Sequence, residues 1–148
     1  MAEEAFILLV EDNEMDVVLT LDAFQEARLR NPVHVASTGE RALDYLHGRG
    51  KYQDRDEYPL PDIILLDLKL PGISGMDVLR EIKDRPTLKQ IPVIILSSSS
   101  EEADRALGYD LGVNSYLVKP VSFEGFLSVV GKIKEYWLTI NLGPPRKD

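Results

Sequence analysis

The sequence predicts one α/β domain with a doubly wound (βα)5 fold, in which helices cover both faces of a five-stranded parallel sheet. Two observations support this prediction. Short apolar or β-branched runs recur five times along the 148 residues, and a segment with helical spacing follows each of them. The apolar runs are continuous rather than alternating, which is typical of parallel strands buried on both faces.

Each of the five runs is too short for a helix. The expected strands are residues 6–10, 33–36, 63–66, 93–96 and 115–118. The first, third and fourth are wholly apolar, whereas the second and fifth are weaker runs that contain β-branched residues.

The segments after the strands repeat apolar residues at helical intervals. Candidate helix starts are Thr38, Ser122 and a capping box at Ser99-Ser100-Glu101-Glu102. The apolar residues expected to face the sheet are Val18, Leu21 and Phe24; Ala42, Leu43 and Leu46; Val78, Leu79 and Ile82; Ala103, Ala106 and Leu107; and Phe123, Phe126, Leu127, Val130, Ile133 and Trp137.

Two segments depart from a minimal version of this fold. Residues 48–61 form a polar stretch with glycine and proline that is long for a helix-to-strand connection. We expect an exposed loop there, either a partner surface or a tolerated insertion. Residues 142–148 cannot extend a helix through Pro144-Pro145, so we expect a flexible C-terminal tail. The predicted domain therefore spans residues 1–141, with no output domain after it.

The composition limits the partners and the compartment. Lys and Arg number 17 and Asp and Glu number 25, which gives a formal net charge of −8. Nucleic acid and anionic membranes need a basic surface, so we expect neither as a main partner. No apolar run approaches the roughly 20 residues that cross a bilayer. The acidic N-terminus is unlike a signal peptide and the sequence has no cysteine, so we expect a cytoplasmic protein.

Polar residues stand at the carboxyl ends of four expected strands, the edge at which doubly wound sheets bind ligands. They are Glu11-Asp12 after the first strand, Asp67 after the third, Ser97 after the fourth and Lys119-Pro120 after the fifth. Three carboxylates at one edge would repel one another unless a cation neutralised them. Hard oxygen ligands with room for water predict Mg²⁺ as that cation.

This set of residues is suited to phosphoryl transfer. A carboxylate at such a metal can attack phosphorus, which makes Asp67 the candidate for an aspartyl phosphate. Lys119 and the Ser97 hydroxyl could then bind phosphoryl oxygens. Taken singly, each residue has a simpler explanation, as a helix cap or as a lysine with a buried stem and a solvated charge. Their coincidence at one edge favours the phosphoryl site.

Four segments resemble the response-regulator receiver family, and the resemblance extends over roughly residues 6–137. The segments are Leu9-Val10-Glu11-Asp12-Asn13; Ile64-Leu65-Leu66-Asp67-Leu68-Lys69-Leu70-Pro71 with Gly75; Ile91-Pro92-Val93-Ile94-Ile95-Leu96-Ser97; and Tyr116-Leu117-Val118-Lys119-Pro120. The resemblance implies a flavodoxin-like fold with strand order 2-1-3-4-5. It also implies that a sensor histidine kinase phosphorylates Asp67 from a phosphohistidine.

The resemblance also implies roles for the other site residues. Mg²⁺ would be held by Asp12, Asp67 and the backbone carbonyl of Lys69, and Glu11 would contact the metal through water. Ser97 and Tyr116 would move together when the phosphoryl group arrives. The Lys119-Pro120 peptide bond would be cis.

A narrower resemblance comes from two further features. The long segment at residues 48–61 and the final helix with Tyr136-Trp137 are similar to single-domain receivers that serve bacterial phytochromes and related sensor kinases. An exposed side of that helix could support a homodimer. Glu11 and Ser97 stand where the family also uses Asp and Thr, and neither difference removes the chemistry.

Three alternatives stay open at this point. A Mg²⁺ phosphohydrolase of the haloacid dehalogenase type would have a second Asp two positions after the nucleophile, where this chain has Lys69. A flavin module of flavodoxin type would cradle a phosphate after the first strand, where Glu11-Asp12 would repel it. A receiver could also act by binding alone, without phosphorylation.

Overall fold

The five apolar runs form a parallel sheet in the order β2-β1-β3-β4-β5 in the computed structural model, which describes residues 5–134. The strands are β1 (Ile7–Val10), β2 (Val33–Ala36), β3 (Ile63–Leu66), β4 (Val93–Ser97) and β5 (Ser115–Val118). This order confirms the predicted doubly wound sheet. The predicted bounds differ by one residue at the start of β1 and at the end of β4.

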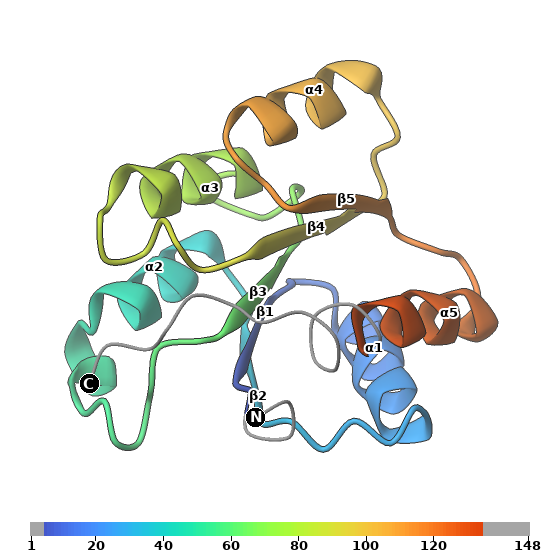
Figure 1. The fold of residues 1–148 in the computed structure, drawn as a ribbon, viewed down its shortest axis with the longest axis horizontal. Helices are drawn as coiled ribbons and strands as arrows, with labels where there is room; N and C mark the ends of the chain where they lie inside the picture. Colours follow the sequence, from blue (N-terminus) through green and yellow to red (C-terminus); the bar gives the residue numbers. More distant parts are fainter. Residues whose placement is uncertain (1–4, 135–148) are drawn as a thin grey trace.

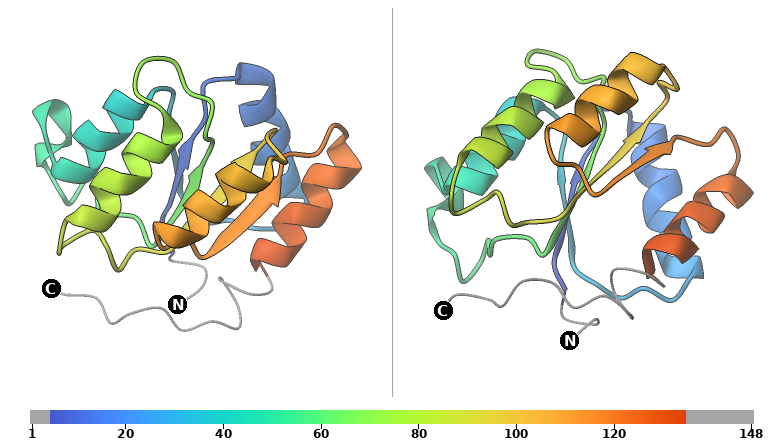
Figure 2. Two further views of the ribbon diagram at one scale, coloured as in Figure 1. Left: turned by 90° about the horizontal axis from the view of Figure 1, so that it is seen from above. Right: turned by 45° about the horizontal axis from the view of Figure 1, so that its top comes forward.

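Helices cover both faces of this sheet. They are α1 (Glu14–Glu26), α2 (Gly39–His47), α3 (Gly75–Asp84), α4 (Glu102–Asp110) and α5 (Phe123–Ile133), with a short 3-10 helix, η2 (Gly50–Gln53). α1 and α5 pack together on one face, whereas α2 and α3 lie on the other and α4 lies beside β5 (Figure 1). The turned views in Figure 2 show the same separation. None of the described helices is both long and apolar enough to span a bilayer.

The continuous apolar runs reflect a core on each face of the sheet. Successive side chains of a strand point to opposite faces. Leu8 and Ile64 therefore pack in the cluster under α2 and α3, whereas Ile7 and Ile63 pack in the cluster under α1 and α5. Every residue of β1 and β3 is buried, which explains why these strands have no polar face.

Two of the three predicted helix starts are confirmed. The Thr38 hydroxyl accepts a hydrogen bond from the Arg41 N–H of α2, and the Ser122 hydroxyl accepts one from the Gly125 N–H of α5. The predicted capping box of α4 is wrong, because this helix begins at Glu102 after Glu101 and has no side-chain cap. Ser99 is instead buried in the β4–α4 connection, where its hydroxyl donates to the Asp104 carboxylate (2.6 Å).

Three residues expected to face the sheet are exposed instead. They are Val18 on α1 and Ala103 and Ala106 on α4. α1 buries Thr20, Ala23 and Phe24, and α4 buries only Gly108. The predictions for Tyr136, Trp137 and the tail at residues 142–148 lie outside the described residues.

Residues 48–61 form a folded segment that is only partly exposed. Tyr52 and Pro61 are buried, and Tyr52 packs against the ring of Tyr45 on α2 (centroids 5.0 Å apart). His34 of the edge strand β2 lies 4.7 Å from the same Tyr45 ring. Burial there lowers the pKa of His34, and the charge of Lys51 adds to this effect. The insertion therefore extends the core over the edge of the sheet.

Arg55 joins this insertion to the end of α2. Its guanidinium donates to the carbonyl oxygens of Tyr45 (2.8 Å), Leu46 (2.8 Å) and Tyr58 (3.1 Å). The last carbonyl groups of a helix have no partner within the helix. Arg55 thus adds donors to the last turn of α2, where the Tyr45 carbonyl also accepts a backbone N–H, from Gly48 (3.1 Å).

Replacing Arg55 with methionine should lower the free energy of unfolding by about 2 kcal/mol, because three partly buried carbonyl groups lose a charged donor. Urea denaturation followed by circular dichroism would measure the change. Arg49→Met is the matched control, since Arg49 pairs with Asp44 at an exposed site and should contribute less than about 0.5 kcal/mol. Equal losses in the two variants would contradict the role of Arg55.

Candidate functional site

The carboxyl ends of four strands place polar residues at one edge of the sheet. Backbone hydrogen bonds continue the sheet pattern beyond the strands: the Glu11 N–H donates to Ala36 O (3.0 Å), the Asp67 N–H to Val10 O (3.0 Å) and the Lys119 N–H to Ser97 O (2.6 Å). The sheet itself therefore holds these residues at a common level.

Three carboxylates meet at this edge. Glu11, Asp12 and Asp67 each offer an oxygen, and these oxygens lie within 4.8 Å of one another. Glu11 and Asp67 are only 4% and 5% exposed, whereas Asp12 is exposed. Carboxylate oxygens with one open side suit a divalent cation that keeps part of its water shell. The residues present therefore fit a hard divalent metal ion.

Lys119 lies against the same carboxylates. Its Nζ is 2.8 Å from Glu11 Oε1, 2.8 Å from Asp16 Oδ2 and 3.0 Å from Asp67 Oδ2. Burial by itself would lower the pKa of Lys119, but the hydrogen bonds to Asp16, Glu11 and Asp67 together raise the pKa above its ordinary value. Lys119 is therefore a charged ammonium whose three donors are all engaged by carboxylates.

Sequence reasoning did not find Asp16. An acidic residue in the first turn of a helix is explained by the helix dipole, and Asp16 lies in the first turn of α1. Its spacing was the available signal, because Asp16 follows Asp12 by four residues, about one helical turn. The spacing alone does not show that α1 would face Lys119.

Burial acts on the carboxyl group of Glu11 in the opposite sense to the nearby ammonium of Lys119. Burial raises the pKa of Glu11 to about 7; the hydrogen bond from Lys119 opposes this shift and the charge of Asp67 adds to it. One ammonium is shared by three carboxylates, so part of their repulsion remains. A further cation at this edge would relieve that repulsion.

Binding of a divalent cation should therefore strengthen as the pH rises towards about 7. The pKa of Glu11 in the folded chain is about 7, above its ordinary value of 4.5. The cation-free protein therefore loses stability as the pH rises from about 4.5 to about 7. A cation needs the ionised carboxylate, and its affinity should fall up to about tenfold per pH unit below 7.

Thermal unfolding with and without Mg²⁺ or Mn²⁺ at about pH 5.5 and about pH 8 would test this expectation. The increase in Tm caused by the cation should be larger at the higher pH. Glu11→Gln should remove most of the difference. An unchanged pH dependence in that variant would show that another group titrates.

Ser97 and Tyr116 are linked through Ser99. The Ser97 side chain is fully buried, and its hydroxyl accepts a hydrogen bond from the Ser99 N–H (3.2 Å). The Tyr116 hydroxyl donates to the carbonyl oxygen of the same Ser99 (2.8 Å). A shift of Ser97 would therefore act on Ser99, the residue whose carbonyl group accepts the hydrogen bond from Tyr116.

The carboxylate cluster with Lys119 and Ser97 agrees with the family to which comparison with known proteins assigns the chain. The response regulator receiver domain matches residues 7–130. The chain belongs to the response regulator receiver family.

Three similar proteins extend this finding over nearly the full chain. A probable methanogenesis regulatory protein, FilR2 of Methanothrix harundinacea, is 41% identical over 97% of this chain and 90% of its own length. Response regulator Rcp1 of Synechocystis is 37% identical over 89% of this chain and 88% of its own. The crystal structure of the phosphorylated cyanobacterial phytochrome response regulator RcpA is similar with a TM-score of 0.89, 39% identity and coverage of 96% and 99%. A Mn²⁺-bound form of Rcp1 is similar with a TM-score of 0.86, 35% identity and coverage of 95% and 99%.

The structure bears on two further expectations for the receiver site, the carbonyl group of Lys69 and the Lys119-Pro120 bond. The Lys69 N–H donates to Asp67 Oδ1 (3.2 Å) and its side chain is exposed. The metal-binding role of its carbonyl group stays a prediction. The prediction of a cis Lys119-Pro120 bond is wrong: every peptide bond among the described residues is trans. Trans is the lower-energy isomer by about 0.5–1 kcal/mol, and in this isomer Lys119 already reaches all its carboxylate partners.

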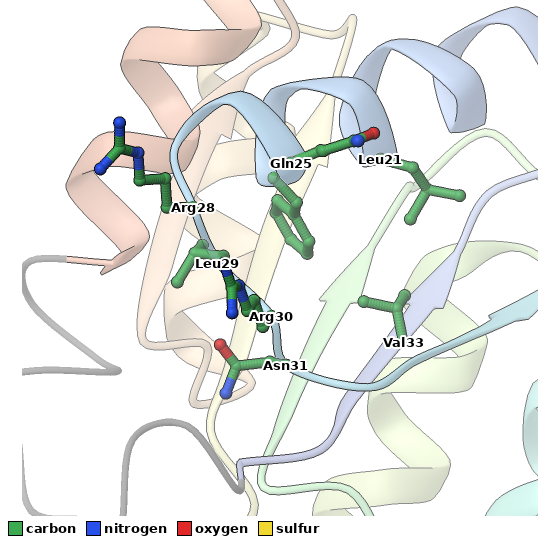
Figure 3. A pocket seen from close by; sticks show the side chains of 8 residues that line it. Leu21, Gln25, Arg28, Leu29, Arg30, Asn31 and Val33 are labelled. Atoms are coloured by element: carbon green, nitrogen blue, oxygen red, sulfur yellow. The ribbon is translucent and has the colours of Figure 1, made fainter.

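A separate cleft lies away from the receiver site. It has a volume of about 430 Å³ and lies between the second half of α1 and the start of β2 (Figure 3). The receiver site, in contrast, lies at the carboxyl ends of the strands. Its lining residues are Leu21, Phe24, Gln25, Arg28, Leu29, Arg30, Asn31 and Val33. None of these eight is a carboxylate, histidine or serine, so the cleft adds no group to the chemistry at Asp67.

Proposed function

We propose that this chain is a receiver that accepts a phosphoryl group on Asp67 and then changes its protein contacts. One observation carries the proposal: a buried carboxylate at a strand end lies both beside Lys119 and within a carboxylate cluster open to water on the Asp12 side. We further propose Mg²⁺ as the metal, with Asp12, Asp67 and the Lys69 carbonyl as its ligands and Glu11 in contact with it through water. Signal output would then be protein contact or onward phosphotransfer.

The chemistry follows from these positions. An Asp67 oxygen attacks the phosphorus of a phosphohistidine, the P–N bond breaks, and its electron pair returns to the imidazole of the donor. Bound Mg²⁺ would neutralise charge on the phosphoryl oxygens. Lys119, already 3.0 Å from Asp67, is placed to donate to one of those oxygens. The Ser97 hydroxyl is the candidate donor to another.

The proposed partner is a sensor histidine kinase. Exposed apolar side chains lie close in sequence to two site residues, namely Met15 (65% exposed) and Val18 (50%) near Asp16 on α1 and Val121 (fully exposed) near Lys119. Such residues around a polar site support docking of another protein. The similarity to RcpA supports a phytochrome-like kinase, whereas the name of FilR2 points to a different signal. We place this exchange in the cytoplasm. Homodimerisation stays a prediction that size-exclusion chromatography would test.

The switch would be a shift between two packings. Phosphorylation replaces one carboxylate charge by a dianion with new hydrogen-bond acceptors. These acceptors attract the Ser97 hydroxyl and the Lys119 ammonium. Because Ser99 links Ser97 to Tyr116, we infer that Tyr116 turns inward as Ser97 shifts and that the surface of α4, β5 and α5 changes. Unchanged partner binding by phosphorylated Tyr116→Ala would contradict this mechanism.

A phosphohydrolase is the competing enzymatic function. It would need a general acid two positions after Asp67, and this position carries the exposed cation Lys69. We therefore propose a signalling protein that catalyses only its own phosphorylation and dephosphorylation.

Intact-mass measurement after incubation with acetyl phosphate would test the proposed function. We expect the mass of one phosphoryl group to be added in the presence of Mg²⁺ and not in the presence of a chelator. Failure to form an adduct with acetyl phosphate or a phosphorylated kinase would instead support a receiver that acts by phosphate-independent binding.

A further inference from the structure

Asp16 is a third carboxylate on Lys119, and the chemistry at Asp67 does not require it. We propose that Asp16 competes with the phosphoryl group for Lys119 and so lowers the affinity of the site for that group. This inference rests on the proposed function of Asp67. It makes Asp16 a positioning residue that acts through Lys119.

The contact with Asp16 is as short as any that the Lys119 ammonium makes with the three carboxylates. Asp16 Oδ2 lies 2.8 Å from Nζ, and α1 fixes the backbone at this position. The Asp16 N–H donates to Asn13 Oδ1 (3.0 Å), and the Asp16 carbonyl accepts from the Thr20 hydroxyl (2.7 Å). The Asp16 side chain therefore extends from a well-fixed backbone position on α1.

Lys119 has no spare donor in the unphosphorylated site. An ammonium has three N–H groups, and Glu11, Asp16 and Asp67 each occupy one direction around Nζ. A phosphoryl group on Asp67 brings new acceptors to this point. An N–H group of Lys119 that continues to donate to Asp16 cannot donate to these phosphoryl oxygens.

Asp16 is also unnecessary for keeping Lys119 in the site. Glu11 and Asp67 are nearly buried and hold the ammonium from the strand side, whereas the Asp16 side chain is 21% exposed. Removal of the Asp16 charge should therefore leave Lys119 in place. Competition, rather than loss of position, is the expected main effect.

Charge repulsion acts in the same direction. Asp16 Oδ2 and Asp67 Oδ2 both lie within 3.0 Å of Nζ, so they are at most about 6 Å apart, a range in which like charges disfavour each other. A phosphoryl dianion on Asp67 increases the negative charge that faces Asp16. Asp16 therefore destabilises the phosphorylated site relative to the unphosphorylated one.

Beryllofluoride, a non-covalent mimic of the phosphoryl group, gives an equilibrium test. Its apparent Kd would be measured by calorimetry on the full chain in saturating Mg²⁺ for wild type, Asp16→Asn, Asp16→Glu and Glu14→Gln. Asp16→Asn should bind about two- to fivefold more tightly, the range expected for one partly exposed ion pair. Asp16→Glu keeps the carboxylate and should bind as wild type does.

Glu14→Gln is the matched control, because Glu14 is an exposed acidic residue in the same first turn of α1. It should leave the affinity unchanged. Equal affinities of Asp16→Asn and wild type, weaker binding by Asp16→Asn, or equal gains in Asp16→Asn and Glu14→Gln would each overturn the role of Asp16. Failure of the wild-type chain to bind beryllofluoride would instead count against the proposed function of Asp67.

Discussion

Asp67→Asn should abolish phosphorylation of this receiver. The amide that replaces the carboxylate has no anionic oxygen to attack phosphorus, and it removes the negative charge of one of the three carboxylates whose oxygens lie within 4.8 Å of one another. After incubation with acetyl phosphate and Mg²⁺, intact mass should show the adduct in wild type and not in the variant. The size of this effect follows from the loss of the reacting atom itself.

The folded state should survive this substitution. Lys119 keeps Glu11 and Asp16 as partners, and removal of the Asp67 charge eliminates one of the causes that raise the pKa of Glu11. Asp84→Asn is the matched control, because Asp84 is an exposed residue at the end of α3 and should still allow the adduct. An adduct of wild-type yield in Asp67→Asn would mean that another residue accepts the phosphoryl group.

Gly75→Ala should have the largest effect on stability among these substitutions, and it should also impair the site. Gly75 begins α3, where its N–H donates to Leu68 O (2.9 Å). A Cβ at Gly75 would overlap the backbone carbonyl oxygen of Asp67 and lie 2.5 Å from the Cα of Leu68. These are backbone atoms, which cannot turn aside as a flexible side chain can.

We therefore expect the free energy of unfolding to fall by about 3 kcal/mol, the upper part of the range for overpacking. Phosphorylation by acetyl phosphate should also slow by about tenfold or more, because small displacements of a reacting group are costly. Urea denaturation and the time course of the mass shift would measure the two effects.

Gly131→Ala provides the opposite case within α5. No heavy atom lies within 4 Å of a Cβ added there, apart from the neighbours and backbone of the helix itself. This substitution should stabilise the protein by about 0.5–1 kcal/mol, since alanine favours the helix interior over glycine. Similar losses of stability in Gly75→Ala and Gly131→Ala would contradict the close approach at Asp67.

The sequence by itself determined the sheet and the place of the site. Continuous apolar runs specify strands buried on both faces, and five strand–helix repeats leave few ways to wind a parallel sheet. Residues that directly follow strands are then carried to one edge wherever the helices lie. Glu11, Asp67, Ser97 and Lys119 could therefore be assigned to a common edge without coordinates.

Only the tertiary structure decided how side chains from separate helices and loops meet. Lys119 and Asp16 are 103 residues apart, and their contact depends on how α1 packs beside the strand ends. Arg55 likewise bonds to carbonyl groups of α2 because the insertion folds back over that helix. α4 begins later than its serine run predicts because Ser99 is held in the site by Asp104 and Tyr116. Local patterns report which face of an element is buried, whereas these contacts depend on distances between elements that no local pattern contains.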